Sequence, residues 1–343
     1  MTEAIATLRR WGGEFSIDRV WLAFALVLAT LAFVDLRQAE EGVVFTLAAL
    51  AETGPYILFS VLVAAYATAT GADGQIAKVF SGRQAAMITL AALFGGLSPF
   101  CSCGVIPLIA ALLAMGVPLA PVMAFWLASP VIDPAQFVMT MGTLGTEFAV
   151  AKTVAAVSLG LFGGFGTLAL MRFGFLSDPL RPGVGNGGCG GAKIRNPKPP
   201  VWRFWREAER REKFAREARR SGLFLLKWLA LAFLLESVML AYVPAEAVGA
   251  VVGGEGAMPV LIATLVGVPA YLNGYAALPV VQGLMEQGMV PGAAMAFLVA
   301  GGVSSLPAAM AVFALARLPV FALYLGFALV GSLAAGLIFG AIA

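Results

Sequence analysis

Long apolar runs, separated by short polar segments, follow one another along almost the whole chain. A run of about 18 residues or more is long enough to cross a hydrocarbon layer of about 30 Å as an α-helix. Backbone groups inside lipid must be hydrogen-bonded within the chain, so helices are the expected spanning elements. The pattern predicts long helices over residues 20–36, 43–70, 118–140, 147–172, 222–243, 290–310 and 318–342.

Two irregular segments interrupt this pattern, at Ser98–Gly104 and Pro269–Tyr275, and a shorter apolar stretch lies on either side of each. Stretches of about 13 to 16 residues are short for a full span and are typical of half-helices or re-entrant hairpins. The two segments also correspond, because one constant offset in numbering (279 − 107 = 172) aligns Pro107 with Pro279. The same offset pairs Gly95 with Gly267, Gly116 with Gly288, Met123–Phe125 with Met295–Phe297, and Ala128 with Ala300. A run of identities at one register indicates an internal repeat, and we call this shift the repeat offset.

The distribution of charge predicts the orientation of the two repeats. Of 22 Lys and Arg residues, 12 lie between Phe173 and Ser221, and the positive-inside rule places that loop in the cytoplasm. Arg9, Arg10 and Arg19 precede the first apolar run. That run has no small-residue cleavage pattern, so we expect a retained span whose N-terminus lies inside. The first repeat then begins outside and the second begins inside, so we expect inverted repeats.

The expected fold is therefore an all-α, polytopic transmembrane helical bundle with two inverted repeats, each with a broken or re-entrant helix hairpin. Its expected segments are a cytoplasmic N-terminus with the first span (1–42), repeat 1 (43–173), a basic cytoplasmic linker (174–221) and repeat 2 (222–343). Broken helices that meet near the midplane between inverted repeats recur in secondary transporters. The pattern alone thus predicts movement of a small solute across a membrane.

Composition narrows the function further. The chain is 60% hydrophobic and 12% charged, with a mean hydropathy of +0.91, which excludes a soluble domain because such domains are about 25% charged. It contains no histidine, so a metal site would lack imidazole and a proton relay would use carboxylates. The spans contain no nucleophile–base set, and no phosphate-binding Gly-rich motif occurs, so we expect neither an enzyme, nor a bound cofactor, nor direct use of ATP.

The expected partners are the solute and membrane lipid. The basic stretch 202–220 mixes aromatic residues with Arg and Glu, which suits a helix at the inner membrane surface better than nucleic-acid binding. An oligomer, such as a dimer, is compatible with the sequence.

The first candidate site is the irregular segment Pro99-Phe-Cys-Ser-Cys-Gly-Val-Ile-Pro107. Proline removes backbone donors and glycine permits unusual dihedrals, so this segment should interrupt the helix and expose backbone groups toward a cavity. Its two thiols suit a soft metal or metalloid, although buried cysteines also serve as small hydrophobic side chains. The other repeat supplies an amide and a phenol at the equivalent positions, so the predicted solute ligands are Cys101, Ser102, Cys103, Asn273 and Tyr275.

The second candidate site is Asp133, which lies between two prolines in the span predicted over 118–140. An intramembrane carboxylate is costly and therefore a functional candidate, here for binding a proton or cation, unless it reaches water at the outer boundary. Glu52 and Glu236 lie within spans and are further coupling candidates, with interfacial solvation as the alternative for each. The charged residues expected only to snorkel from span ends are Glu147, Lys152, Lys227 and Glu286. The positions expected to break helices are Pro99, Gly104, Pro107, Pro130, Pro134, Pro269, Gly274, Pro279 and Pro307.

Three motifs of this chain resemble those of the ArsP-type predicted permease family: Ser98-Pro-Phe-Cys-Ser-Cys-Gly-Val-Ile-Pro107, Ala128-Ser-Pro-Val-Ile-Asp-Pro134 and Asn273-Gly-Tyr-Ala-Ala-Leu-Pro279. The resemblance covers nearly the whole chain after the first span. It implies an inner-membrane efflux permease for trivalent organoarsenicals such as methylarsenite, with Cys101 and Cys103 as the metalloid ligands. The Gly-rich loop carries only Cys189, fewer cysteines than in some relatives.

The residues and the resemblance together predict a permease that exports a small soft, thiol-reactive solute by gradient-driven alternating access. Its membrane is the cell inner (plasma) membrane, with the N-terminus and the 174–221 loop in the cytoplasm. One alternative is a permease for another metal ion or sulfur-bearing solute. A different alternative is a membrane assembly subunit that transports nothing.

Overall fold

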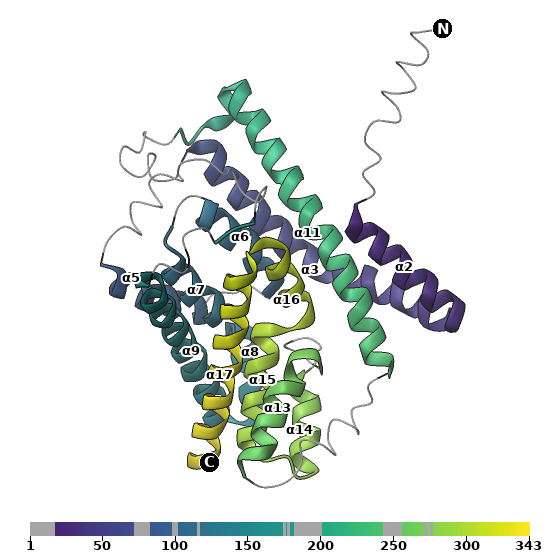
Figure 1. The fold of residues 1–343 in the computed structure, drawn as a ribbon, viewed down its shortest axis with the longest axis vertical. Coiled ribbons are helices and arrows are strands. Elements are labelled where there is room, and N and C mark those ends of the chain that lie inside the picture. Colours follow the sequence, from purple (N-terminus) through teal and green to yellow (C-terminus); the bar gives the residue numbers. More distant parts are fainter. Residues whose placement is uncertain are drawn as a thin grey trace.

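The computed structural model describes residues 18–71, 83–97, 102–114, 117–173, 176, 179–181, 201–242, 256–270, 274 and 277–343 (Figure 1). Within these ranges the chain forms helices and no β-strand apart from an isolated bridge between Leu180 and Ala316. Large apolar side chains such as Phe33, Val154 and Ile338 are exposed on the outside of the bundle, where a soluble protein would carry polar groups. The prediction of an all-α helical membrane bundle is confirmed.

The helices of the described ranges fall into an N-terminal helix and two series of six. The N-terminal helix is α2 (Arg19–Val34). The first half comprises α3 (Leu36–Thr70), α5 (Gln84–Leu97), α6 (Ser102–Ala114), α7 (Leu119–Ala128), α8 (Pro134–Leu144) and α9 (Thr146–Arg172). The second half, after the short 3-10 helix η1 (Phe204–Arg206), comprises α11 (Ala208–Tyr242), α13 (Ala257–Ala270), α14 (Ala277–Glu286), α15 (Pro291–Ser304), α16 (Leu306–Leu315) and α17 (Leu318–Ile342).

Four described helices or helix pairs are long and apolar enough to cross a membrane: Thr146–Arg172, Ala208–Tyr242, Pro291–Leu315 and Leu318–Ile342. A fifth candidate is α3, whose parts Leu36–Pro55 and Ile57–Thr70 meet at 47°. The bend follows Pro55, whose ring removes one intrahelical hydrogen bond and crowds the preceding turn. Short apolar helices, including α5, α7 and α13, lie among these spans.

Helix boundaries in the two halves recur at the repeat offset that the sequence predicts. Helix α3 begins at Leu36 and α11 at Ala208, which is the same offset (208 − 36 = 172), and both are 35 residues long. The starts of α7, α8 and α9 are likewise related by this offset to the starts of α15, α16 and α17. The repeat therefore extends from sequence identities to the helix pattern.

Close helix packing repeats as well, in the same register. A Cβ at Gly164 of α9 would meet Ile88, Ala124 and the carbonyl oxygen of Ala120 within 3.3 Å. A Cβ at Gly336 of α17 would meet Val260, Ala296 and the carbonyl oxygen of Gly292 within 2.7 Å, and these four residues are the repeat equivalents of the first four. The two halves thus bring their long last helix against the preceding helices through the same glycine contact.

The last helices of the two halves contact each other with their chains running in opposite directions. Phe148 of α9 lies against Phe339 of α17 with ring centroids 5.1 Å apart, and Phe162 lies against Phe327 at 5.2 Å. Between these pairs, Leu159 meets Gly331, and these two positions are themselves equivalent in the repeat (331 − 159 = 172). Equivalent residues that face each other across antiparallel helices define a local two-fold axis perpendicular to both helices.

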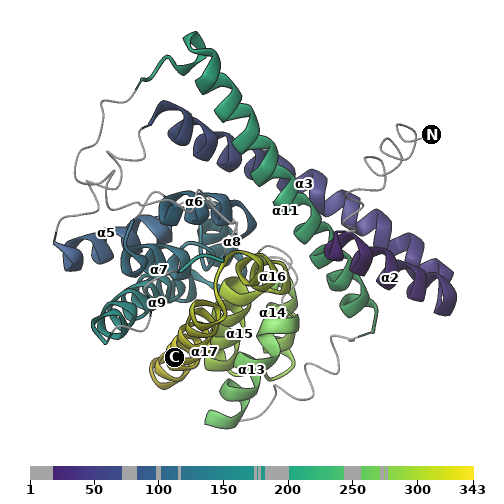
Figure 2. The ribbon, with the colours of Figure 1, turned by 45° about the horizontal axis from the view of Figure 1, so that its top comes forward.

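Helices α3 and α11 form a second antiparallel pair on the other side of the molecule, where α2 packs beside them (Figures 1 and 2). The Gln38 amide donates to the Ser237 hydroxyl at 3.3 Å near the start of α3, and Lys213 donates to the carbonyl oxygen of Thr68 at 2.8 Å near its end. Helix α11 begins earlier than the span predicted at 222, because residues 208–221 continue the helix through pairs such as Arg216 with Glu212 (3.6 Å).

Several predicted helix breaks lie elsewhere than expected. Gly104 and Pro107 were predicted to interrupt a helix, but α6 runs through both from Ser102. Pro269 and Pro279 likewise lie inside α13 and α14, next to the interruption rather than in it, whereas Gly274 lies within it. Proline is tolerated in the first turn of a helix because its missing N–H has no partner there, which explains Pro279. Pro99 falls outside the described residues.

Candidate functional site between the two halves

The predicted interruption of the span at 118–140 is present, as a turn between α7 and α8. Helix α7 ends at Ala128 and α8 begins at Pro134, with Pro130 in the turn between them. Asp133 caps α8: its Oδ1 accepts hydrogen bonds from the backbone N–H groups of Ala135 (2.8 Å) and Gln136 (2.9 Å). Proline as the first helical residue has the backbone angle that a helix start needs. The Asp-Pro sequence therefore begins α8 and holds one carboxylate at the break.

A buried lysine lies behind this break. Lys152 of α9 is 0% exposed, and its Nζ donates a hydrogen bond to Oε1 of Gln136 at 3.3 Å. Asp133 is close enough to stabilise the Lys152 ammonium group electrostatically. Thr140, one turn further along α8, is also buried and donates to the carbonyl oxygen of Gln136. We refer to Asp133, Gln136, Thr140 and Lys152 as the polar cluster.

The polar cluster of the first half meets the irregular segment of the second. Helix α14 packs on α8, and a Cβ at Gly274, between α13 and α14, would overlap the side-chain amide of Gln136. Gln136 thus contacts Lys152 on one side and the backbone of the opposite half on the other. The repeat-related pair, α6 and α16, is also in contact. Each half therefore brings the helix after its irregular segment against a half-helix of the other half.

The equivalent break in the second half has different chemistry. Ser305 stands at the N-terminus of α16 in place of Asp133, and its side chain makes no capping hydrogen bond. Tyr324 of α17 stands in place of Lys152, and its hydroxyl donates to the carbonyl oxygen of Val303. The Tyr324 ring lies 5.2 Å from that of Trp126, which comes from the first half. Pro307 lies in the first turn of α16, as predicted for a helix interruption.

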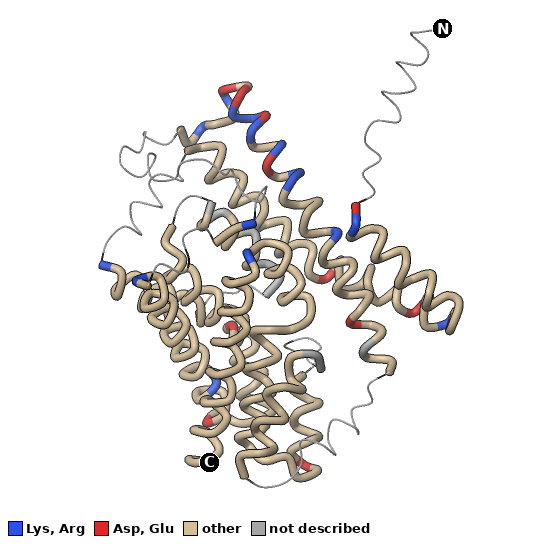
Figure 3. Tube along the Cα trace, in the orientation of Figure 1, with Lys and Arg blue, Asp and Glu red and all other residues tan. Residues whose placement is uncertain are grey.

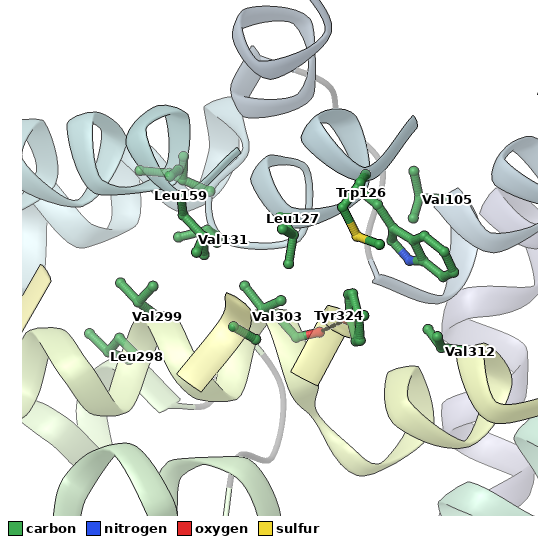
Figure 4. Packing of buried hydrophobic residues seen from close by; sticks show 14 of the residues in the cluster. Val105, Trp126, Leu127, Val131, Leu159, Leu298, Val299, Val303, Val312 and Tyr324 are labelled. Atoms are coloured by element: carbon green, nitrogen blue, oxygen red, sulfur yellow. Dashed lines mark hydrogen bonds between the residues drawn. The ribbon is translucent and has the colours of Figure 1, made fainter. Parts of the chain in front are cut away.

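Apolar side chains fill the space between the two breaks. In Figure 4, Leu127 and Val131 of the first half face Val299 and Val303 of the second. All four are fully buried, and Val131 and Val303 are equivalent positions in the repeat. The interface at the breaks is therefore apolar, and the polar cluster lies beside it.

The two predicted intramembrane glutamates have different surroundings. Glu236 of α11 is 3% exposed, and its Oε2 has no hydrogen-bond partner among the residues that the structure describes. Glu52 lies on an exposed face of α3, three residues before the bend at Pro55. Burial thus favours Glu236 over Glu52 as a functional carboxylate, and the two interpretations of Glu52 stay open.

The predicted thiol site lies largely outside the described residues, which do not include Cys101, Asn273 or Tyr275. Ser102 and Cys103 are the first two residues of α6. Within the described ranges, no three Cys, Asp or Glu side chains come together in a way that could hold a metal ion. The thiol site remains a prediction.

Lys152 was expected to reach water from the end of its span, and this expectation is wrong. It lies in the second turn of α9, but α8 folds back beside that turn and covers the side chain completely. Sequence reasoning also gave no role to Gln136 or Tyr324. The internal repeat contained a signal for two of these residues, because the repeat offset aligns Lys152 with Tyr324 and so pairs a cation with a phenol at one position.

An apolar groove of about 470 Å³ lies between α9 and α17. It is lined by side chains such as Val154, Phe162, Val330 and Ile338, several of which are exposed on the outer surface. Ser158 is the one polar residue in its lining. The groove lacks groups that would select a polar or soft solute, so the polar cluster is the stronger candidate.

Comparison with known proteins identifies a family. The family model ArsP_1, described as a predicted permease, matches residues 38–341. The UPF0718 protein YcgR of Bacillus subtilis (strain 168) is 33% identical over 101 residues, which cover 29% of this chain and 34% of that protein. The match thus spans about a third of the length of this curated relative. No solved structure matches the chain.

Proposed function

Because the chain belongs to this family of predicted permeases, we propose that it exports a small soft, thiol-reactive solute by gradient-driven alternating access. Family and fold together support a membrane transporter. Trivalent organoarsenicals such as methylarsenite are the proposed substrates. The proposal places the protein in the cell inner membrane.

One observation carries this proposal: a helix break with a buried charge in one half lies against the irregular segment of the other half. Gln136 contacts both Lys152 and the backbone at Gly274. Transporters bind solutes where broken helices of two repeats meet, since unwound backbone and half-helix ends supply binding groups there. A movement of one half relative to the other must change this contact, which is what alternating access requires.

The antiparallel pairs support the inverted arrangement of the repeats. If α9 and α17 both cross the bilayer, the two-fold axis at Leu159 and Gly331 lies in the membrane plane, which is the relation between inverted repeats. Charge agrees with this orientation: Lys and Arg gather over the N-terminal half of α11 (Figure 3), whereas the first turns of α3 carry a single cation, Arg37, beside Glu40 and Glu41. We therefore propose that the basic end of α11 faces the cytoplasm.

For the solute, we propose the thiols of Cys101 and Cys103 as ligands, with Ser102, Asn273 and Tyr275 completing the site. Thiolates favour soft metal and metalloid centres. Support comes from position, because these residues lie at the starts of α6 and α14 or just before them, and each of these helices packs against a half-helix of the opposite half.

For coupling, we propose protonation of a carboxylate, with Glu236 as the first candidate. A carboxylate buried away from hydrogen-bond donors favours its neutral, protonated form, so its proton can be exchanged as access changes. Asp133 is the second candidate and Glu52 the third, because Glu52 is exposed.

Uptake into everted membrane vesicles tests this function. We expect wild-type vesicles to accumulate methylarsenite, Cys101→Ser and Cys103→Ser to lose most of the uptake, and a protonophore to abolish it. Asp133→Asn and Glu236→Gln should reduce uptake without removing methylarsenite binding. Failure of wild-type vesicles to accumulate methylarsenite would reject this substrate class, and uptake that persists with the protonophore would reject proton coupling.

A further inference from the structure

The ammonium group of Lys152 has more hydrogen-bonding capacity than its surroundings use. An ammonium carries three N–H donors, and Lys152 uses one of them, toward the neutral amide of Gln136. The ion pairs between described residues do not include Lys152. A cation that is 0% exposed and held by a single neutral acceptor at 3.3 Å is costly unless a negative group joins it.

The nearby carboxylate of Asp133 is engaged at the start of α8. Its Oδ1 accepts the two backbone N–H groups there, and its influence on Lys152 is electrostatic. The carboxylate is also partly exposed, whereas the ammonium is not. Asp133 therefore stabilises the Lys152 ammonium group electrostatically. The remaining N–H donors of Lys152 can still bind a second negative group.

In the second half, the donor at the position equivalent to Lys152 has a hydrogen-bond acceptor for its one proton. Tyr324, the equivalent of Lys152, has one hydroxyl proton and donates it to the carbonyl oxygen of Val303. A structural role at this position needs only such a neutral group. The lysine adds a charge and two donors, and it does so beside Gln136, where the backbone of the second half arrives at Gly274.

We propose that Lys152 binds an anionic oxygen group, a carboxylate or an oxyanion, at the contact between the halves. This inference rests on the proposed function for its full form: the solute would carry a soft atom for the thiols and an anionic group for Lys152. The same chemistry could come from a small anion that is transported together with a neutral soft solute. In either case the anion replaces or joins Gln136 at the Lys152 ammonium, so its binding alters the contact between Gln136 and Gly274.

The first arm of the test needs no transport. The full-length protein is purified in detergent, and its unfolding temperature is measured with rising sodium benzoate at constant ionic strength, set with sodium chloride. Benzoate should raise the unfolding temperature of wild type and of the control Tyr324→Phe, because a ligand stabilises the state that binds it. It should not do so for Lys152→Gln, which keeps a donor for Gln136 but no charge. If Lys152→Gln does not fold, Lys152→Arg is compared with wild type instead. Because Lys152→Arg retains the charge, benzoate should still raise its unfolding temperature.

The second arm distinguishes the two sources of the anion. Everted vesicles are given phenylarsine oxide or 4-carboxyphenylarsine oxide, which differ by one carboxylate. If the solute carries the anion, the uptake ratio of the acid to the neutral probe should fall about thirtyfold or more in Lys152→Gln, the effect expected for losing one buried charge partner. If a separate anion binds, added benzoate should instead stimulate uptake of phenylarsine oxide in wild type but not in Lys152→Gln.

The inference is overturned if benzoate stabilises wild type and Lys152→Gln equally, or stabilises neither. Absence of uptake of both arsenicals by wild-type vesicles would reject the proposed function instead, and the unfolding measurement would still decide whether Lys152 binds an anion.

Discussion

The two helix breaks share their architecture and differ in their chemistry. In the first half, Asp133 caps α8 and Lys152 lies buried behind it; in the second, Ser305 and Tyr324 occupy the same positions without any charge. Backbone interruption and close packing recur at a constant offset, but ionisable groups do not. The repeat therefore supplies the backbone arrangement that both halves share. The first half alone supplies the charges at the breaks, on which we expect solute or coupling ion to act.

The largest expected effect on stability comes from the close glycine contact that the two halves share. Gly164→Val and Gly336→Val each place a side chain where the neighbouring helix already lies within 2.8 Å of a Cβ. Each should lower the free energy of unfolding by about 1–3 kcal/mol or more, since an overpacked helix contact must open. The control is Gly326→Val in α17, where no atom lies within 4 Å of a Cβ. Unfolding temperatures in detergent measure this, and markedly unequal losses at Gly164 and Gly336 would contradict equivalent packing.

A smaller effect separates the two breaks. Asp133→Ala should destabilise the protein by about 1 kcal/mol or more, because α8 loses its cap and the buried Lys152 loses a nearby negative charge. Asp133→Asn should cost less, since an amide oxygen can still accept the same bonds and only the charge is lost. Ser305→Ala should leave stability unchanged, because Ser305 makes no capping bond. The same unfolding measurement applies. A loss in Ser305→Ala equal to that in Asp133→Ala would remove the difference between the breaks.

The smallest effect concerns position 227, where the halves also differ: Lys227 in α11 aligns with Pro55, where α3 bends. Lys227 donates a hydrogen bond to Asp18, ahead of α2, and thereby lowers the pKa of that carboxyl below its ordinary 3.8. A lowered folded-state pKa gives stability that is present above the ordinary value and lost as the pH falls through the lowered one. Both side chains are partly exposed, so the contribution is about 1 kcal/mol or less.

Lys227→Met tests this small contribution. The difference in unfolding temperature between wild type and Lys227→Met should be present near neutral pH and disappear in acid. A difference that grows as the pH falls would contradict the assignment to Asp18.

Much of the fold could be predicted from the sequence. The length of an apolar run indicates a helix that can cross lipid, and identities at one offset indicate a repeated helix pattern. The boundaries of α9 and α17 and the interruption at Asp133 followed from these signals. Gly104 and Pro107 were assigned to a break because both residues are unfavourable in helix interiors, but α6 runs through them, and the apolar residues between them, Val105 and Ile106, are fully buried.

The site was harder to predict because it depends on contacts between distant segments. A lysine near the start of a span looks the same in sequence whether it reaches water or, like Lys152, is covered by α8, and only the fold distinguishes these cases. The role of Gln136 likewise requires knowing that α14 packs on α8. The only indication in the sequence was that the repeat aligns Lys152 with Tyr324. This alignment shows where the two halves differ but does not show what the lysine does.

The most direct test of the account is methylarsenite uptake by everted vesicles that contain Gly274→Val, compared with Gly283→Val. Position 274 lies against Gln136, whereas Gly283, in the nearby helix α14, has no atom within 4 Å of a Cβ. If the solute pathway runs where the halves meet, Gly274→Val should lose uptake while remaining monodisperse in detergent, and Gly283→Val should keep it. If Gly274→Val takes up methylarsenite at the wild-type rate, the solute pathway does not run where the halves meet.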